Sequence, residues 1–239
     1  MQRLLRLVTA IALLGLPPTA APATDQPPRR TISVAGEGRV SATPDLAIVS
    51  FAVETTAPQA GAAVDDNARK STAVSAAIKE RLEAKDKVTT TGYSLDPYYE
   101  QRERGSGQPP KISGYIARNE VRVELHRIDA VGRLIDAATE AGANRVSGLQ
   151  FTLENRAPQL REALQQAGRE ARQQAESVAA ALDVKLKQIV AATTSVGPII
   201  MPHRYEGLAM AAAESRAPTP VEPGEVTVTA TLQVTYEIE

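Results

Sequence analysis

Gly36 and Gly38, separated by Glu37, have the spacing that begins a dinucleotide-binding loop. Such a loop, G-x-G-x-x-G, leaves a strand and opens a helix whose N-terminus meets the pyrophosphate. Here Ser41 stands where the third glycine should be, and a turn at 43–45 leads into a second alternating apolar run. A glycine pair inside a strand is more typical of a bulge or of a close approach by another backbone. The pair is therefore predicted to be structural.

Acid–base and nucleophilic chemistry has few candidates in this sequence. The only histidines are His126 and His203, and there is no cysteine and no G-x-S-x-G nucleophile elbow. His126 closes a charged strand and is interpreted as a surface or helix-entry residue, and Asp65 and Asp66 as part of a solvated helix face. We predict that the protein is not an enzyme and assign no catalytic or cofactor-binding residues. A hydrolase stays open as a third hypothesis.

One set of residues could bind a soft metal. Met201, His203 and Met210 carry thioether and imidazole groups of the kind that bind Cu(I). They lie in a Pro- and Ala-rich segment at about 197–223, which is longer than an ordinary connection between strands. This segment is predicted to be a flexible loop, either without fixed structure or used for interaction. Three weak ligands on such a loop favour the absence of a metal site, so no metal ligand is assigned.

Four of the six tyrosines, Tyr93, Tyr98, Tyr99 and Tyr115, fall on one predicted hairpin. A tyrosine usually buries its ring and keeps its hydroxyl wet, which favours packing or subunit contact here. A ligand site is the alternative. The formal net charge of −1, with 3% aromatic residues and no Trp, gives no reason to expect a nucleic-acid partner.

The N-terminus has the pattern of a secretory signal peptide. Arg3 and Arg6 precede an apolar run of about 10 residues, too short for the ~20 that span a bilayer, and an Ala-Pro-Ala series ends at Ala23. We predict cleavage after Ala23, which makes 1–23 the signal peptide and 24–30 a polar leader. No other segment is long and apolar enough to span a membrane. Export to the periplasm is the simplest prediction, with burial rather than disulfides stabilising the fold.

The elements that position these residues can be derived from periodicity. Period-two runs predict strands at 31–40 and 47–54, joined through the 43–45 turn as a hairpin. Further strands are predicted at 87–99, 112–125, 145–154, 186–195 and 226–238, with 101–110 as a polar hairpin tip. Amphipathic helices are predicted from Pro58 to about Ala84, from 128 to 141, and from Pro158 to Leu182. The prediction is an α+β fold with mostly antiparallel sheet packed by three amphipathic helices, in the order ββαββαβαββ.

Several segments together resemble the SIMPL-domain family. The segments that carry the resemblance are 32–40 with Pro44 to Ala47, 91–99, 112–119, Gly142-Ala143, 162–181 and Pro223-Gly224. The resemblance covers residues 31–239, which would form one SIMPL-like domain. It implies an exported bacterial protein, often periplasmic or associated with the outer membrane. Some members are linked to oxidative-stress defence or are immunogenic, some assemble into large oligomers, and the family has no agreed catalytic residues.

These patterns support three hypotheses. The leading one is a non-enzymatic, self-assembling periplasmic protein with a role in envelope maintenance or oxidative-stress protection. The second is a periplasmic binding module for a metal or a small ligand, and the third is the hydrolase. A homo-oligomer is expected because three segments offer contact surfaces. They are the charged strand 118–124, the tyrosine-rich hairpin, and the terminal strand 226–238, which is interpreted as a possible sheet edge. Peripheral association with the envelope is compatible with this expectation.

Overall fold

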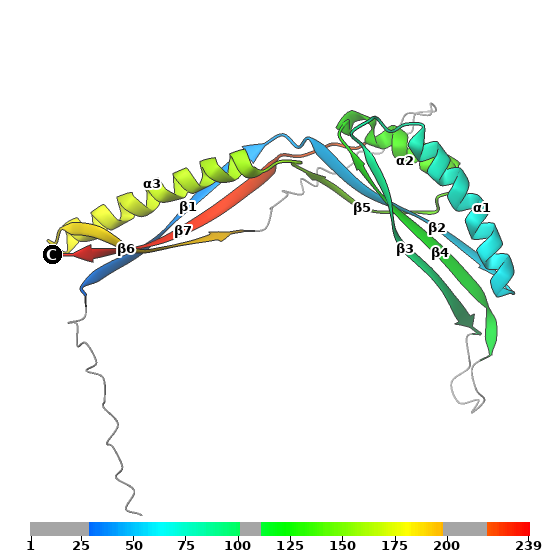
Figure 1. Cartoon of the computed structure of the whole chain (residues 1–239), viewed down its shortest axis with the longest axis horizontal. Helices are drawn as coiled ribbons and strands as arrows, with labels where there is room; N and C mark the ends of the chain where they lie inside the picture. The colour runs from blue at the N-terminus through cyan, green and yellow to red at the C-terminus, as the bar shows by residue number, and fades with distance from the viewer. Residues whose placement is uncertain (1–28, 101–110, 198–218) are drawn as a thin grey trace, which may run out of the picture.

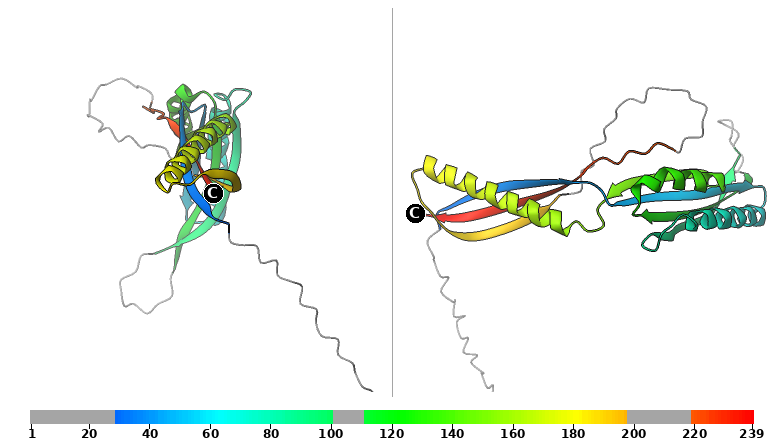
Figure 2. Two further views of the ribbon diagram at one scale, coloured as in Figure 1. Left: turned by 90° about the vertical axis from the view of Figure 1, so that its left-hand side faces the viewer. Right: turned by 90° about the horizontal axis from the view of Figure 1, so that it is seen from above.

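The chain forms two lobes, each with strands and helices, that lie end to end as an elongated arch (Figure 1). The computed structural model describes residues 29–100, 111–197 and 219–239. Each lobe has one antiparallel sheet with helices on one face, and the three helices lie on the outer side of the arch (Figures 1 and 2). The predicted α+β class, with three helices and antiparallel sheets, is confirmed.

The α3 lobe contains both ends of the described chain. Its three-stranded sheet has the order β1 (Thr31–Ala42), β7 (Val226–Ile238), β6 (Leu186–Val196). Helix α3 (Ala157–Ala181) packs mainly on β1 and β7. The face without a helix is rich in hydroxyl groups, which pair across strands, as in Ser33 Oγ to Thr235 Oγ1 at 2.9 Å.

The α1–α2 lobe has a four-stranded sheet in the order β3 (Lys87–Tyr99), β4 (Ile112–Leu125), β2 (Leu46–Ala57), β5 (Arg145–Thr152). Helices α1 (Ala60–Lys79) and α2 (Val131–Glu140), the latter preceded by a short 3-10 turn at Ile128–Ala130, cover one face. The core between sheet and helices is built from alternate residues of β2 and β4 and from one stripe of each helix. Its fully buried large side chains include Val49, Phe51, Val74, Ile78, Val123, Leu125, Val131 and Leu134. Among the described residues, none of the helices combines the length and apolarity needed to cross a membrane.

The predicted hairpin between the first two strands is wrong. β1 pairs with β7 and β2 pairs with β4 and β5, so the two strands belong to different sheets and residues 43–45 carry the chain between the lobes. The crossing is held by Asp45, whose N–H donates to Thr152 O at 3.1 Å and whose Oδ1 accepts the N–H of Glu154 at 2.7 Å. A Pro-Asp turn indicates that a strand ends, but it does not indicate with which strand the following one will pair.

The prediction that strand 226–238 lies at a sheet edge is also wrong. β7 is the central strand, with β1 on one side from Thr31↔Glu237 to Ala42↔Val226 and β6 on the other. Its alternate residues therefore face α3 on one side and the bare face of the sheet on the other. The edge strands of this sheet are β1 and β6.

The predicted loop 197–223 is described only at its two ends. Residues 198–218 lie outside the described residues. At the far end, Thr219 is held against α2, because its N–H and hydroxyl donate to the two carboxylate oxygens of Asp136 at 3.2 and 2.6 Å. Val221 packs against the core of the α1–α2 lobe. The chain thus returns across α2 before it enters the α3 lobe as β7.

Candidate functional site

The glycine pair lies beneath the backbone of α3. Every fourth residue of this helix, Ala163, Ala167, Ala171, Ala175 and Ala179, is buried, so the helix presents a flat stripe to β1. A Cβ at Gly36 would collide with Ala167 O and the N of Ala171, and a Cβ at Gly38 with Ala163 O. The pair allows a helix and a strand to approach closely, as predicted, and contributes no phosphate loop.

The same helix also protects the free edge of β1. The N–H of Glu37 donates to Glu170 Oε2 at 2.7 Å, and the N–H of Arg39 donates to Gln166 Oε1 at 3.2 Å. Side chains of α3 thus take the place of a neighbouring strand at these two residues. The carboxylate of Glu37 meanwhile pairs with the guanidinium of Arg39 at 2.7 Å on the exposed face.

His126 lies between two carboxylates near the junction of the lobes. Its Nδ1 lies 3.0 Å from Asp86 Oδ1, and its own N–H donates to the same oxygen at 2.9 Å. The other carboxylate oxygen of Asp86 accepts the N–H of Glu83 at 2.8 Å. Nε2 of His126 lies 3.4 Å from Glu154 Oε1, at ion-pair distance but without hydrogen-bond geometry. His126 was predicted to be a surface or helix-entry residue, and it lies partly exposed just before the turn Ile128–Ala130, where it also ties the end of β4 to the turn before β3.

The two ionisable groups stabilise each other's charge. The pKa of His126 lies above its ordinary value, mainly because its imidazole donates to Asp86, with burial opposing the shift and Glu154 adding to it. Burial by itself raises the pKa of Asp86, but the N–H groups of Glu83 and His126 and the imidazole outweigh it, so this pKa lies below its ordinary value. An Asp–His pair resembles the base half of a hydrolase triad. Here, however, the second nitrogen faces a carboxylate, so the arrangement is that of a structural clamp.

The clamp should make stability depend on pH. Protonated His126 stabilises the fold fully below its unfolded pKa of about 6.5, and the gain is lost as pH rises through its higher folded pKa. Asp86, whose pKa is lowered, contributes stability throughout this range and loses that contribution only at much lower pH, where its carboxylate takes up a proton. Between pH 5.5 and 8.5 the thermal midpoint of the wild type is therefore expected to fall relative to that of His126→Gln. Thermal melts followed by circular dichroism at half-unit pH steps measure this difference.

Glu154→Gln serves as the graded control for that experiment. Since Asp86 is the main cause of the raised pKa of His126, this variant should keep most of the pH dependence. Parallel melting curves for wild type and His126→Gln across the whole range would contradict the clamp.

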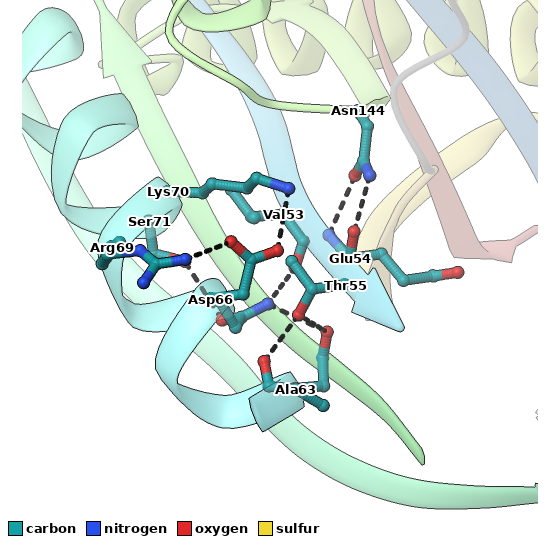
Figure 3. Close-up of polar contacts among 11 residues, drawn as sticks. Val53, Glu54, Thr55, Ala63, Asp66, Arg69, Lys70, Ser71 and Asn144 are labelled. Carbon is teal, nitrogen blue, oxygen red and sulfur yellow. Dashed lines mark hydrogen bonds and ion pairs between the residues drawn. The ribbon is translucent and has the colours of Figure 1, made fainter. Parts of the chain in front are cut away.

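A second polar cluster fastens α1 to its sheet (Figure 3). Asn67 is buried at 1% exposure, and its amide nitrogen donates to Val53 O at 2.8 Å and to Ala117 O at 2.9 Å. Buried Thr55 donates to Ala63 O, at 2.8 Å. These bonds join the helix to both β2 and β4 through main-chain carbonyls. The predicted buried stripe of this helix, made of Val64, Ser71, Val74, Ile78 and Leu82, did not include Asn67.

Asn144 completes the other side of β2. Its side-chain amide accepts the N–H of Glu54 at 2.9 Å and donates to Glu54 O at 2.7 Å, as a paired strand residue would (Figure 3). Gly142, with φ of +114°, turns the chain out of α2 so that Asn144 reaches this position. The amides of both clusters bind main-chain groups of this chain.

The four tyrosines of the β3–β4 hairpin do not converge. Tyr98 is paired with Gly114, whereas Tyr115 is paired with Pro97, so the two rings point to opposite faces of the sheet. Tyr93 and Tyr99 are 56% and 52% exposed. The arrangement supplies exposed aromatic surface, and the packing or contact interpretation stays a prediction, with a ligand site as its alternative.

The suggested copper ligands Met201, His203 and Met210 lie outside the described residues. Within residues 29–100, 111–197 and 219–239, no group of three or more metal-binding side chains is arranged for an ion. A hollow of about 530 Å³ lies between the C-terminal end of α3 and the start of β6, lined in part by Ala179, Leu186 and Ile189. It contains no histidine and is remote from the His126 clamp.

Comparison with known proteins identifies the family of this chain. The sequence profile described as SIMPL, a protein of unknown function (DUF541), matches residues 32–236, which extend from the start of β1 nearly to the end of β7 and so cover both lobes. The chain belongs to the SIMPL family. The family resemblance predicted from the sequence is thereby confirmed.

Curated relatives of this SIMPL chain come from several bacteria. It is 30% identical over 220 residues to the 26 kDa periplasmic immunogenic protein of Brucella melitensis, covering 90% of this chain and 87% of that protein. The Brucella abortus protein of the same name matches equally well. The uncharacterized protein YggE of Escherichia coli K12 is 25% identical over 146 residues, which is 61% of this chain and 58% of YggE.

Proposed function

We propose that this SIMPL protein is an exported, non-enzymatic periplasmic protein that assembles with copies of itself. The periplasmic location is supported by the N-terminal sequence pattern and by the names of the Brucella relatives. A non-enzymatic role is supported by the clusters around His126 and Asn67, whose hydrogen bonds are made within the fold. A role in envelope maintenance or oxidative-stress protection is what the family resemblance implies.

The observation that carries self-assembly is the amount of sheet left without a partner. Each lobe has a helix layer on one face only, and each sheet ends in two edge strands within the described chain. Exposed apolar side chains lie along these edges, including Tyr93, Val146 and Ile189. A protein that exposes open sheet edges must cover them or charge them, and symmetric assembly covers them.

The test uses protein purified from the periplasm of the native host. Its N-terminus is expected at or near Thr24, and sedimentation equilibrium at several concentrations should give a mass that is a multiple of the mature chain. Native mass spectrometry of the same sample reports stoichiometry together with any retained molecule. A single species of one chain at all concentrations would exclude self-assembly, and a retained metal or small ligand would favour the binding-module alternative.

A further inference from the structure

We propose that two copies of this chain pair through the free edge of β6, with the two strands antiparallel across a two-fold axis. The inference rests on the proposed self-assembly and names its interface. The paired strands would join two three-stranded sheets into one sheet of six, in the order β1-β7-β6-β6-β7-β1. Both α3 helices would lie on the same face of that sheet, because an antiparallel pair is related by an axis perpendicular to the sheet.

The other three sheet edges are obstructed in the described structure. On β1, side chains of Gln166 and Glu170 already accept outward N–H groups. β3 contains Pro97 and has two register shifts against β4. β5 pairs irregularly with β2 around Gly148, whose φ is +64°. Proline, irregular pairing and side-chain capping are the devices by which proteins block strand addition.

Over most of its length, β6 has few of the features that block the addition of another strand. From Gln188 to Ser195 the strand contains no charged residue and no proline. Ile189 and Val190 are 59% and 42% exposed, and α3 packs mainly on the other two strands of the sheet. The two register shifts of β6 against β7 end at Ala191, and the pairing is regular from there to Val196. The segment 191–196 is thus an even, uncharged edge of the kind that accepts another strand.

The segment is complementary to itself. Residues directly opposite each other in an antiparallel pair point to the same face, so a two-fold axis at Thr193 sets Thr193 opposite its own copy. Ala191 then faces Ser195, and Ala192 faces Thr194. These are small, neutral pairs, and Thr–Thr pairs across strands are favourable. Lys187 lies beyond the far end of the other strand in this register, so its two copies do not approach each other.

The chain offers a matched pair of positions for a test. Thr193 and Ala35 are both paired with Gln233, from opposite sides, so both lie in the same row on the bare face of the sheet. Both are exposed, and only Thr193 lies at the proposed interface. Thr193→Lys would set two like charges opposite each other across the axis. The full mature protein with Thr193→Lys is expected to dissociate at least ten-fold more readily in sedimentation equilibrium, whereas Ala35→Lys should match the wild type.

A covalent test is possible because the chain has no cysteine. Directly opposed residues of an antiparallel pair lie at Cα separations of about 4.5–5.5 Å, within the range that a disulfide spans. Thr193→Cys should form a disulfide-linked dimer under mild oxidation with diamide, and Ala35→Cys should not. Absence of that dimer, with an assembly unaffected by Thr193→Lys, would overturn the β6 interface while leaving self-assembly intact. A wild type that is monomeric at every concentration would overturn both.

Discussion

Replacing Gly38 with alanine is expected to destabilise the α3 lobe by about 3 kcal/mol or more. The added Cβ would overlap the carbonyl oxygen of Ala163, a backbone atom in the middle of a helix. β1 cannot withdraw without losing its twelve-residue register with β7, and α3 cannot withdraw without exposing its stripe of buried alanines. The measurement is urea unfolding followed by circular dichroism, in which the midpoint of unfolding should move to lower urea.

Gly168→Ala is the matched control for Gly38→Ala. Gly168 lies within α3, and a Cβ there would make an ordinary contact at 3.6 Å with Leu232. Alanine is favoured over glycine in a helix by up to about 1 kcal/mol, so this variant should be as stable as the wild type or more stable. If Gly38→Ala were as stable as Gly168→Ala, the close approach of helix and strand would be refuted.

Replacing Asn67 with leucine is expected to cost about 2–4 kcal/mol of unfolding free energy in the α1–α2 lobe. Leucine has the same branch at Cγ but is bulkier and cannot donate, so Val53 O and Ala117 O lose the amide that lies 2.8 and 2.9 Å away. Because Asn67 is fully buried, leucine gains apolar burial there, but the strain of a larger side chain in a packed site offsets that gain. Thermal and urea unfolding of the two proteins measure the difference.

Ser71→Ala provides the comparison for Asn67. Ser71 donates to Asn67 Oδ1 at 3.2 Å from a partly buried position, so its removal breaks one bond of the cluster and leaves both sheet carbonyls bonded. A loss below about 1 kcal/mol is expected. An Asn67→Leu protein that is no less stable than Ser71→Ala would show that the amide does not hold the helix on the sheet.

The position of each element could be predicted from the sequence, because burial leaves a periodic trace in side-chain type. The predicted strand 112–125 coincides with β4, and the predicted strand 226–238 with β7. The glycine pair could be interpreted as structural because Ser41 and a turn, rather than a third glycine and a helix, come after it. Asn67 was missed because a polar residue on a helix is more often solvated, and only its neighbours in space reveal the two strand carbonyls that its amide bonds.

The sequence could exclude several kinds of catalytic or binding site, but it could not show which residues surround His126. Sequence patterns alone excluded an elbow serine, a cysteine nucleophile and a dinucleotide loop. The partners of His126 are Asp86, 40 positions earlier in the chain, and Glu154, 28 positions later. No spacing rule in the sequence links these three residues. The tyrosines of the β3–β4 hairpin were grouped correctly by sequence, but the pairing with Gly114 was needed to show that Tyr98 and Tyr115 face opposite sides.

Side-chain patterns were enough to establish which segments become strands and helices, which face of each is apolar, and which family the chain belongs to. Strand neighbours were settled only in three dimensions: β1 and β2 belong to different sheets, β7 lies between β1 and β6, and β6 is an edge strand in the part of the chain that the structure describes. This division arises from the chemistry of the backbone. Periodicity of side chains reports which face of a strand is buried, but the N–H and C=O groups that join neighbouring strands are alike at nearly every residue. The choice of neighbour is therefore made by the packing of the whole lobe.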